Sequence, residues 1–186
     1  MEVLLGIVVV AAIAMAVIYN RLVALRQEYK NAYADIDVQL KLRCDLIPNL
    51  VEAVKGYAAH EKDVLTHVSE ARATAMRGGG MAQRGAAEAQ LSGALTQLMA
   101  VAENYPQLKA DQNFLQLQSE LADIENKIAA ARRFLNNSVA EYNTAIEQFP
   151  AGLFARNFGF APAPMFELDE TERAATKEPP KVSFGG

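Results

Sequence analysis

The chain of 186 residues is long enough for one domain with its own hydrophobic core. Alanine is abundant, tryptophan is absent and aromatic residues make up 8% of the chain, a composition that favours helices over strands. The net charge of -4 is spread without a basic stripe, so we expect no nucleic-acid partner. Cys44 is the single cysteine, which excludes an intrachain disulfide and a thiolate metal cluster built by one chain. We therefore predict an all-α protein.

Residues 3–19 form an apolar segment that contains no charged side chain. As a helix this segment would span roughly 25 Å, close to the lower limit for crossing a bilayer. A cleaved signal peptide is the alternative, but its basic leading region is missing, and the sequence continues as a helix after the segment. We therefore predict a retained transmembrane anchor over residues 1–19, with residues 3–19 in contact with membrane lipid.

The charges that flank this segment predict its orientation. Arg21, Arg26 and Lys30 follow it, whereas Glu2 is the only charged residue before it. Because positively charged flanks stay on the cytoplasmic side, we expect a single-pass protein with its N-terminus outside and its C-terminal body in the cytoplasm.

Apolar residues recur at helical spacing after the anchor and predict one helix over residues 20–76. Pro48 lies inside it, where its ring removes an amide and crowds the carbonyl of Cys44 at a cost of about 3 kcal/mol. The apolar positions keep their register across the proline, which favours a kink within one helix over a helix end. We expect Asp45 and Asn49 to help satisfy the freed backbone groups. A hinge or a contact point at these three residues is the functional alternative.

The glycine-rich stretch at residues 77–85 is expected to end this helix and to form a flexible link that includes Gly85. A phosphate-binding loop is the alternative, but no strand precedes it and no Gly-Lys-Ser/Thr follows. A second helix is predicted over residues 82–104, because Tyr105 is pushed out of the helical region by the proline after it. A third helix is expected to begin after Asp111, which is a plausible N-cap.

The third predicted helix carries an apolar residue at every seventh position. This seam consists of Phe114, Leu121, Ile128, Leu135, Tyr142 and Phe149. Such spacing predicts a coiled-coil-like packing face of about 55 Å, which would lie antiparallel along the first helix. We therefore expect residues 20–160 to form a left-handed bundle of three long helices, and a short fourth helix at residues 151–157 is left open.

Polar residues on the first and third predicted helices are candidates for contacts between helices. They are Asp35, Asp37 and Arg43 on the first helix, and Glu125, Arg132 and Asn136 on the third. Buried ion pairs would fix the register of the helices, whereas a catalytic carboxylate pair would require a pocket that the sequence does not reveal.

No metal or cofactor site is predicted. His60 and His67 lie seven residues apart, which places their imidazoles roughly 10 Å apart on one helix face, too far to share one ion. Cys44 has no neighbouring histidine, so we do not expect a reactive thiol.

Aromatic residues accumulate among glycines and prolines after Pro150, which is unlike a disordered linker. The candidates for docking are Phe154, Phe158, Phe160 and Phe166. Burial of a phenylalanine is worth about 1.5–3 kcal/mol, so we expect several rings to dock on the bundle or on a neighbouring subunit. Residues 161–186 are predicted to form a C-terminal tail that is loose beyond Asp169, with a short apolar anchor at Val182 and Phe184.

Two stretches resemble the LemA family of bacterial membrane-anchored proteins: "VQLKLRCDLIPNLVEAVKGYAAHEKDVLTHVSEARA" and "ENYPQLKADQNFLQLQSELADIENKIAAARRFLNNSVAEYNTAIEQFP". The resemblance extends from the anchor to the phenylalanine-rich tail, and "DLIPNLV" and "ENYP" are its most specific elements. It implies a single transmembrane helix in the bacterial inner membrane, a helical bundle and a family without an established catalytic activity. Leu42 and Cys44 depart from the family pattern, in which a basic residue and a histidine or aromatic residue are expected.

Three functional hypotheses follow from these patterns. The first is a structural or scaffolding protein that self-associates at the membrane, supported by the long heptad seam and the aromatic tail. The second is an adaptor or signal relay in which the helix at Pro48 couples the membrane to protein partners. The third is an enzyme that depends on residues such as Glu125 and Arg132, and it receives the least support from the sequence.

Overall fold

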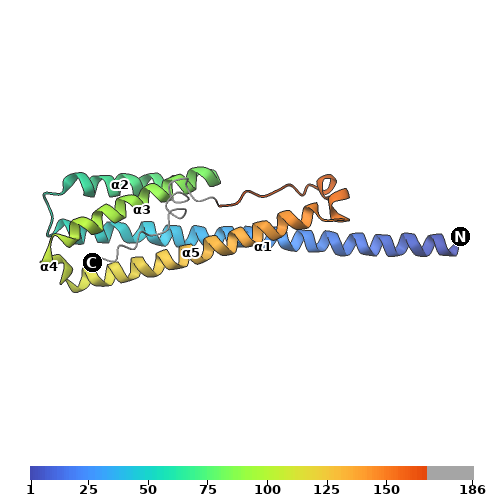
Figure 1. Cartoon of the computed structure of the whole chain (residues 1–186), viewed down its shortest axis with the longest axis horizontal. Coiled ribbons are helices and arrows are strands. Elements are labelled where there is room, and N and C mark those ends of the chain that lie inside the picture. The colour runs from blue at the N-terminus through green and yellow to red at the C-terminus, as the bar shows by residue number, and fades with distance from the viewer. Residues whose placement is uncertain (167–186) are drawn as a thin grey trace, which may run out of the picture. The chain divides into compact units, whose positions relative to one another are not determined.

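The computed structural model describes residues 1–166, apart from the side chains at positions 81 and 82. All regular structure in this part of the chain is helical, as predicted. The elements are α1 (Glu2–Lys55), α2 (Lys62–Met76), α3 (Met81–Glu103), α4 (Pro106–Lys109), α5 (Gln112–Glu147) and the 3-10 turns η1 (Ala151–Leu153) and η2 (Ala155–Phe158) (Figure 1). The predicted tail beyond Asp169, with its apolar anchor at Val182 and Phe184, lies outside the described residues.

The first helix is shorter than predicted. It ends at Lys55, and α2 begins at Lys62 after a turn that starts at Gly56, a poor helix former. Leu65 and Val68 of α2 pack into the same core as the end of α1. The apolar spacing therefore continued across the turn, and the prediction of one helix over residues 20–76 was wrong because two helices that share a core produce the same linear pattern.

The glycine-rich turn is also shorter than predicted. Gly78 and Gly79 have positive φ angles of 70° and 141°, which side-chain-bearing residues rarely adopt. They separate α2 from α3, as expected. Gly85, however, lies inside α3, so the flexible link does not extend that far.

The helices form two compact units, and α1 and α5 contribute to both. The first unit consists of residues 1–40 and 124–165, and the second contains residues 41–123 and Phe166.

In the first unit, α1 and α5 run antiparallel, as predicted. The rings of Tyr29 and Tyr142 lie 4.9 Å apart between their centroids, while Tyr19 contacts residues that follow α5. The buried apolar residues are Leu22, Leu25, Ala32, Ile36 and Leu40 of α1, and Ile128, Leu135, Val139, Tyr142, Ala145 and Ile146 of α5.

The heptad seam of α5 is buried from Phe114 to Tyr142, as the seven-residue spacing predicts. Its last predicted member, Phe149, is 85% exposed. The reason is that α5 ends at Glu147, before Pro150, so Phe149 no longer lies on the packed face of the helix. A short fourth helix at residues 151–157 was left undecided by the sequence. The structure has the two 3-10 turns η1 and η2 there.

In the second unit, α2 and α3 pack on each other and on the end of α1. Its buried core contains Cys44, Ile47, Leu50, Val54, Ala58, Leu65, Val68, Ala71, Leu91, Ala94, Leu95, Leu98, Ala102, Leu108, Phe114 and Leu121. The chain leaves α3 before Tyr105 and Pro106, as predicted, and Pro106 starts the short α4, which was not predicted.

Asp111 caps α5, as its position in the sequence predicts. Its carboxylate accepts a 2.9 Å hydrogen bond from the backbone N–H of Phe114 and a 3.1 Å bond from the hydroxyl of Tyr57. These two donors, the backbone N–H first, hold the pKa of the Asp111 carboxyl below its usual range. The bond to Tyr57 also ties the loop after α1 to the start of α5.

This cap predicts a pH dependence of stability. Because the pKa of Asp111 is lower in the folded chain, its stabilisation is complete above the pKa of an unfolded aspartate and is lost as the pH falls through the folded value. We expect Asp111→Ala to lower Tm at neutral pH, with a difference from the wild type that shrinks in acid. Asp111→Asn is the matched control, since asparagine caps helices but does not titrate. Thermal unfolding followed by circular dichroism checks both, and a difference that is unchanged in acid would contradict the assignment.

Candidate functional site

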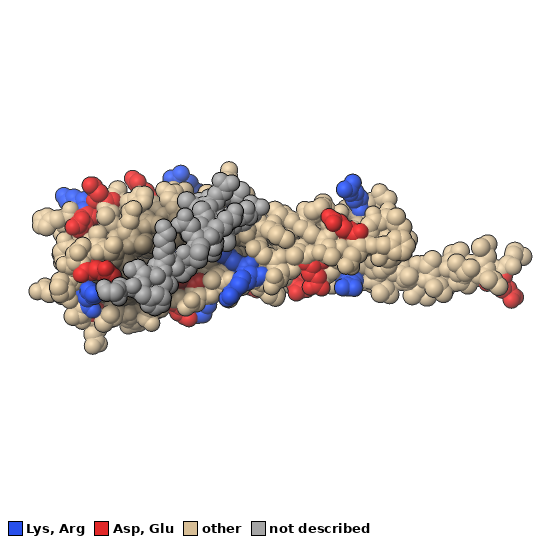
Figure 2. Space-filling view, viewed as in Figure 1, with Lys and Arg blue, Asp and Glu red and all other residues tan. Residues whose placement is uncertain are grey.

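The N-terminal part of α1 presents a surface that only a non-aqueous environment suits. The large side chains of this segment are exposed in the protein: Val3, Leu4, Leu5, Ile7, Val8, Val9, Val10, Ile13, Met15 and Val17. Among the described residues, α1 is the one helix that is long and apolar enough to cross a membrane. In Figure 2 its N-terminal stretch is uncharged except at the tip. This surface indicates membrane anchoring.

The segment after α5 packs against α1 where the apolar stretch ends. The ring of Tyr19 lies 5.5 Å from that of Phe158 and 5.6 Å from that of Phe160, both edge to face. The guanidinium carbon of Arg26 lies 4.8 Å from the centroid of Phe160, within the range of a cation–π contact. The end of the anchor therefore contacts two aromatic side chains of the segment after α5.

Hydrogen bonds between side chains of α5 and backbone groups hold this returning segment on the helix. The hydroxyl of Tyr142 donates a 3.0 Å bond to the carbonyl oxygen of Ala161. The amide of Asn143 bonds both backbone groups of Ala163, donating at 2.9 Å and accepting at 2.8 Å. Burial, and then the neighbouring Tyr29, raise the pKa of Tyr142, so its hydroxyl stays protonated and able to donate at neutral pH.

The four predicted docking aromatics occupy different environments. Phe160 is 1% exposed in the first unit, and Phe166 is buried in the second. Phe154 is half-buried and contacts Phe158 edge to face at 5.8 Å, while Phe158 remains 48% exposed. The buried Phe160 follows Gly159, whose positive φ of 75° ends η2.

Helix α1 continues through Pro48. Asp45 and Asn49, which were predicted to satisfy the backbone groups that the proline frees, do not bond the freed carbonyl. Proline lacks an amide N–H, so the carbonyl of Cys44 loses its partner four residues later. Nε of Arg72, which belongs to α2, donates a 2.6 Å hydrogen bond to this carbonyl oxygen. The side chains of Asp45 and Asn49 are exposed. The proline thus creates an acceptor that ties α2 to α1.

Arg72→Ala is expected to lower the free energy of unfolding by about 1.5–3 kcal/mol, because it leaves the Cys44 carbonyl without a charged donor. In the Pro48→Ala background the same change should cost less, since an alanine amide at position 48 bonds the carbonyl from within the helix. Denaturant unfolding of the four proteins gives the coupling free energy, which is expected to lie between about 0.5 and 3 kcal/mol. An equal cost of Arg72→Ala in both backgrounds would contradict this role.

A buried ion pair joins α1 to α3. The side chain of Arg43 is 0% exposed and that of Glu88 is 4% exposed, and the two form a salt bridge. Nη1 of Arg43 also donates a 3.2 Å hydrogen bond to the hydroxyl of Ser92, one helical turn after Glu88. Arg43 was predicted as a polar contact between helices, but Glu88 and Ser92 were missed because its partner was sought on the third predicted helix.

The sequence pattern of α3 could have identified Glu88 as a buried residue. This residue stands at the start of a buried stripe that continues through Leu91, Leu95 and Leu98 at steps of three and four residues. Arg43 likewise stands between the buried positions Leu40 and Ile47 of α1. A charged residue on each of two apolar stripes predicts a pair, because a buried charge is costly unless it is neutralised.

The other predicted polar contacts lie nearer the surface. Asp35 is exposed, and the half-buried residues are Asp37, Glu125, Arg132 and Asn136. Asp35, Asp37 and the three α5 residues belong to the first unit, whereas Arg43 belongs to the second. The structure therefore does not gather the six candidates into one site within either unit.

Cys44 and the two histidines occupy unremarkable positions. Cys44 is buried, and desolvation raises the pKa of its thiol, which opposes formation of the reactive thiolate. His60 is exposed in the loop before α2, and His67 is half-buried on α2. Within residues 1–166, no cluster of three or more His, Cys, Asp or Glu side chains is placed to hold a metal ion.

Comparison with known proteins finds one family and several relatives. Residues 32–184 match the model of the LemA family. Magnetosome protein MamQ of Magnetospirillum gryphiswaldense is 27% identical over 168 residues, which cover 76% of this chain and 62% of MamQ. Magnetosome proteins MamQ 1 and MamQ 2 of Paramagnetospirillum magneticum are each 27% identical over 187 residues, which cover 86% of this chain and 68% of theirs. The chain thus spans 62% to 68% of the length of these curated relatives.

Proposed function

The chain belongs to the LemA family, and from this premise we propose that it is a membrane-anchored helical scaffold. In this proposal it self-associates, supports or organises the bacterial inner membrane, and carries no catalytic activity. Its partners are membrane lipid, through residues 3–19, and further copies of itself.

The observation that carries this proposal is the continuity of α1. Its N-terminal part is apolar and exposed, while one face of the same helix is buried from Leu22 to Leu40 in the first unit and from Arg43 to Val54 in the second. No linker separates the two parts. A bundle joined to its membrane span in this way is held at the membrane surface, which suits a structural role better than that of a freely diffusing enzyme.

The proposed orientation places the N-terminus outside the cell and the helical body in the cytoplasm. Arg21 and Lys30 are exposed just after the apolar segment, and Arg26 is half-buried against Phe160. These three positive charges lie on the side of the span that the positive-inside rule assigns to the cytoplasm.

Cysteine labelling tests this orientation cleanly, because the single native cysteine is buried. We expect a membrane-impermeant maleimide to label Glu2→Cys in intact spheroplasts. The matched variant Arg133→Cys, at an exposed position on α5, should react only after lysis. Labelling of the α5 variant in intact spheroplasts would reverse the proposed orientation.

Self-association is supported by apolar side chains that stay exposed outside the anchor. They include Val38 and Phe134 in the first unit, and Leu42, Tyr57, Met76 and Leu115 in the second. Native mass spectrometry and cryo-electron microscopy of the full chain, in detergent and in lipid, test the scaffold. We expect discrete oligomers and an altered membrane shape, and a population of monomers alone on flat membrane would contradict the proposal.

A second candidate, an adaptor that recruits another protein, is favoured by one surface of the second unit. A groove of about 730 Å³ lies between the end of α1 and α2. It combines apolar and charged side chains: Val51, Glu52, Lys55, Ala59, Lys62, Leu65, Thr66, Ser69, Glu70 and Ala73. An apolar groove with a charged rim suits an amphipathic partner helix.

Site-specific photocrosslinking in cells separates the adaptor from the scaffold. A crosslinker at Thr66, in the groove, should capture a second protein if the chain is an adaptor. The control position is Gln118, which is exposed on α5. Crosslinks from Thr66 only to other copies of this chain would contradict the adaptor and support the scaffold.

A further inference from the structure

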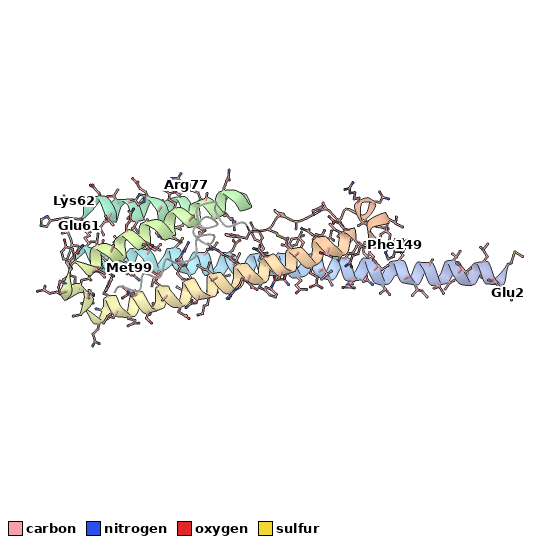
Figure 3. The ribbon with its side chains drawn as sticks, in the orientation of Figure 1. Glu2, Glu61, Lys62, Arg77, Met99 and Phe149 are labelled. Atoms are coloured by element: carbon pink, nitrogen blue, oxygen red, sulfur yellow. The ribbon has the colours of Figure 1, made fainter. Side chains whose placement is uncertain are left out.

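The turns after α5 carry large apolar side chains that contact water in the isolated protein. Phe149 is 85% exposed, Leu153 73% and Phe158 48%. Phe149 lies two residues after Glu147, the last residue of α5, and is labelled in Figure 3. Three such side chains within ten residues are more than a scatter of single exposed residues, and a cluster of this kind marks a contact surface.

These turns are firmly held rather than loose. The N–H of Gly152 donates a 2.8 Å hydrogen bond to the carbonyl of Gln148, and the N–H of Phe160 donates a 3.0 Å bond to the carbonyl of Ala155. A Cβ added at Gly152 would lie 2.7 Å from the carbonyl oxygen of Glu147, so the chain passes too close to α5 for any larger residue. The backbone that carries the exposed side chains of Phe149, Leu153 and Phe158 is therefore held in a fixed conformation.

The turns lie at the level where the apolar part of α1 ends. Tyr19, the last residue of that segment, contacts the rings of both Phe158 and Phe160. Figure 1 shows the orange end of α5 and its turns beside α1, with the blue N-terminal part of α1 continuing alone beyond them. Tyrosine and tryptophan are enriched at this depth, where a membrane span meets the headgroups, and Tyr19 is such a residue.

The charges around the turns suit a lipid surface. Residues 149–166 contain no aspartate or glutamate, and Arg156 is their one charged residue. Arg21 is exposed two residues after Tyr19, and Glu147 is an exposed acid at the end of α5. Basic side chains near a bilayer attract anionic headgroups.

We infer that η1 and η2 form a second membrane contact, in which Phe149, Leu153 and Phe158 insert into the headgroup boundary of the leaflet that α1 enters. Arg156 and Arg21 meet anionic phospholipid there. This inference rests on the membrane anchoring in the proposed function. A bilayer is the occupant that the geometry favours, because Phe158, one of the exposed rings, contacts Tyr19 at the end of the membrane span.

A second contact changes what the anchor does. A single helix is free to rotate about its own axis in the bilayer, and its tilt is set by neighbouring contacts and interfacial side chains. Rings that enter the headgroups on one side of α1 fix that rotation. The first unit is then held in one orientation at the membrane surface, with one face toward lipid.

The absence of tryptophan from the chain allows a direct test of insertion depth. We would prepare Leu153→Trp, Val9→Trp and Phe134→Trp, each in the full-length protein reconstituted with phosphatidylcholine and phosphatidylglycerol. Phe134 is an exposed ring on α5, about 20 Å along the helix from its end at Glu147. We expect shallow brominated lipid to quench Leu153→Trp, with a blue-shifted emission. Deep brominated lipid should quench Val9→Trp, and neither lipid should quench Phe134→Trp.

The outcomes distinguish this inference from the proposal on which it rests. Water-like, unquenched emission from Leu153→Trp, together with deep quenching of Val9→Trp, would overturn the second contact and leave the anchor intact. An unquenched Val9→Trp would instead overturn the anchor. Blue-shifted emission from Leu153→Trp without lipid quenching would mean that a protein surface, such as another copy of this chain, covers the turns, and would also overturn the inference.

Discussion

Replacing Glu88 with alanine is expected to lower the free energy of unfolding by about 3–5 kcal/mol, the usual cost of removing one partner of a buried ion pair. The Arg43 guanidinium is completely buried, so the change removes the carboxylate that neutralises it in a place that water does not reach. Denaturant unfolding of the detergent-solubilised protein, followed by far-ultraviolet circular dichroism, measures this loss.

The matched control removes both charges at once. Arg43→Met combined with Glu88→Leu replaces the pair by apolar side chains of similar length, and such exchanges are neutral or stabilising by about 1–4 kcal/mol in other proteins. Ser92→Ala should cost about 1.5–3 kcal/mol, since it removes one hydrogen bond to the guanidinium. A double variant as unstable as Glu88→Ala would show that the pair is needed for more than neutralising Arg43.

Phe160→Ala is expected to cost about 3–5 kcal/mol, because it empties a fully buried site between Tyr19 and Arg26. It should also release the segment after α5, which limited proteolysis would detect as faster cleavage near residue 160. The loss of the ring removes the contact that holds this segment at the end of the apolar stretch of α1.

Phe158→Ala provides the matched control for this prediction. It removes the same side chain two residues earlier, from a site that also contacts Tyr19 but remains 48% exposed. We expect a clearly smaller loss of stability and little change in cleavage. Equal losses in the two variants would indicate that contact with Tyr19, rather than burial, determines how firmly the segment docks.

Local chemistry made several elements predictable from the sequence. Asp111 was identified as an N-cap because its side chain can reach backbone N–H groups within its own helix, and the structure confirms this. The buried face of α5 followed from a seven-residue repeat in one continuous helix. Both features depend on residues that are close together in the chain.

The features that were missed depend on residues far apart in the chain. The partner of the Cys44 carbonyl is Arg72, 28 residues later, in a helix that the sequence did not separate from α1. The partner of Arg43 is Glu88, on a helix that follows two turns of the chain. Periodicity identifies which face of a helix is buried, but it does not determine which helix covers that face.

The bond between Arg72 and Cys44 has a consequence for biosynthesis. A ribosome releases position 44 well before position 72, so the helix around Pro48 is made with an acceptor whose donor does not yet exist. Until α2 packs against α1, only water can donate a hydrogen bond to the Cys44 carbonyl. Nascent chains arrested before residue 72 are thus expected to have a weakly formed helix around Pro48, although the membrane span is already complete.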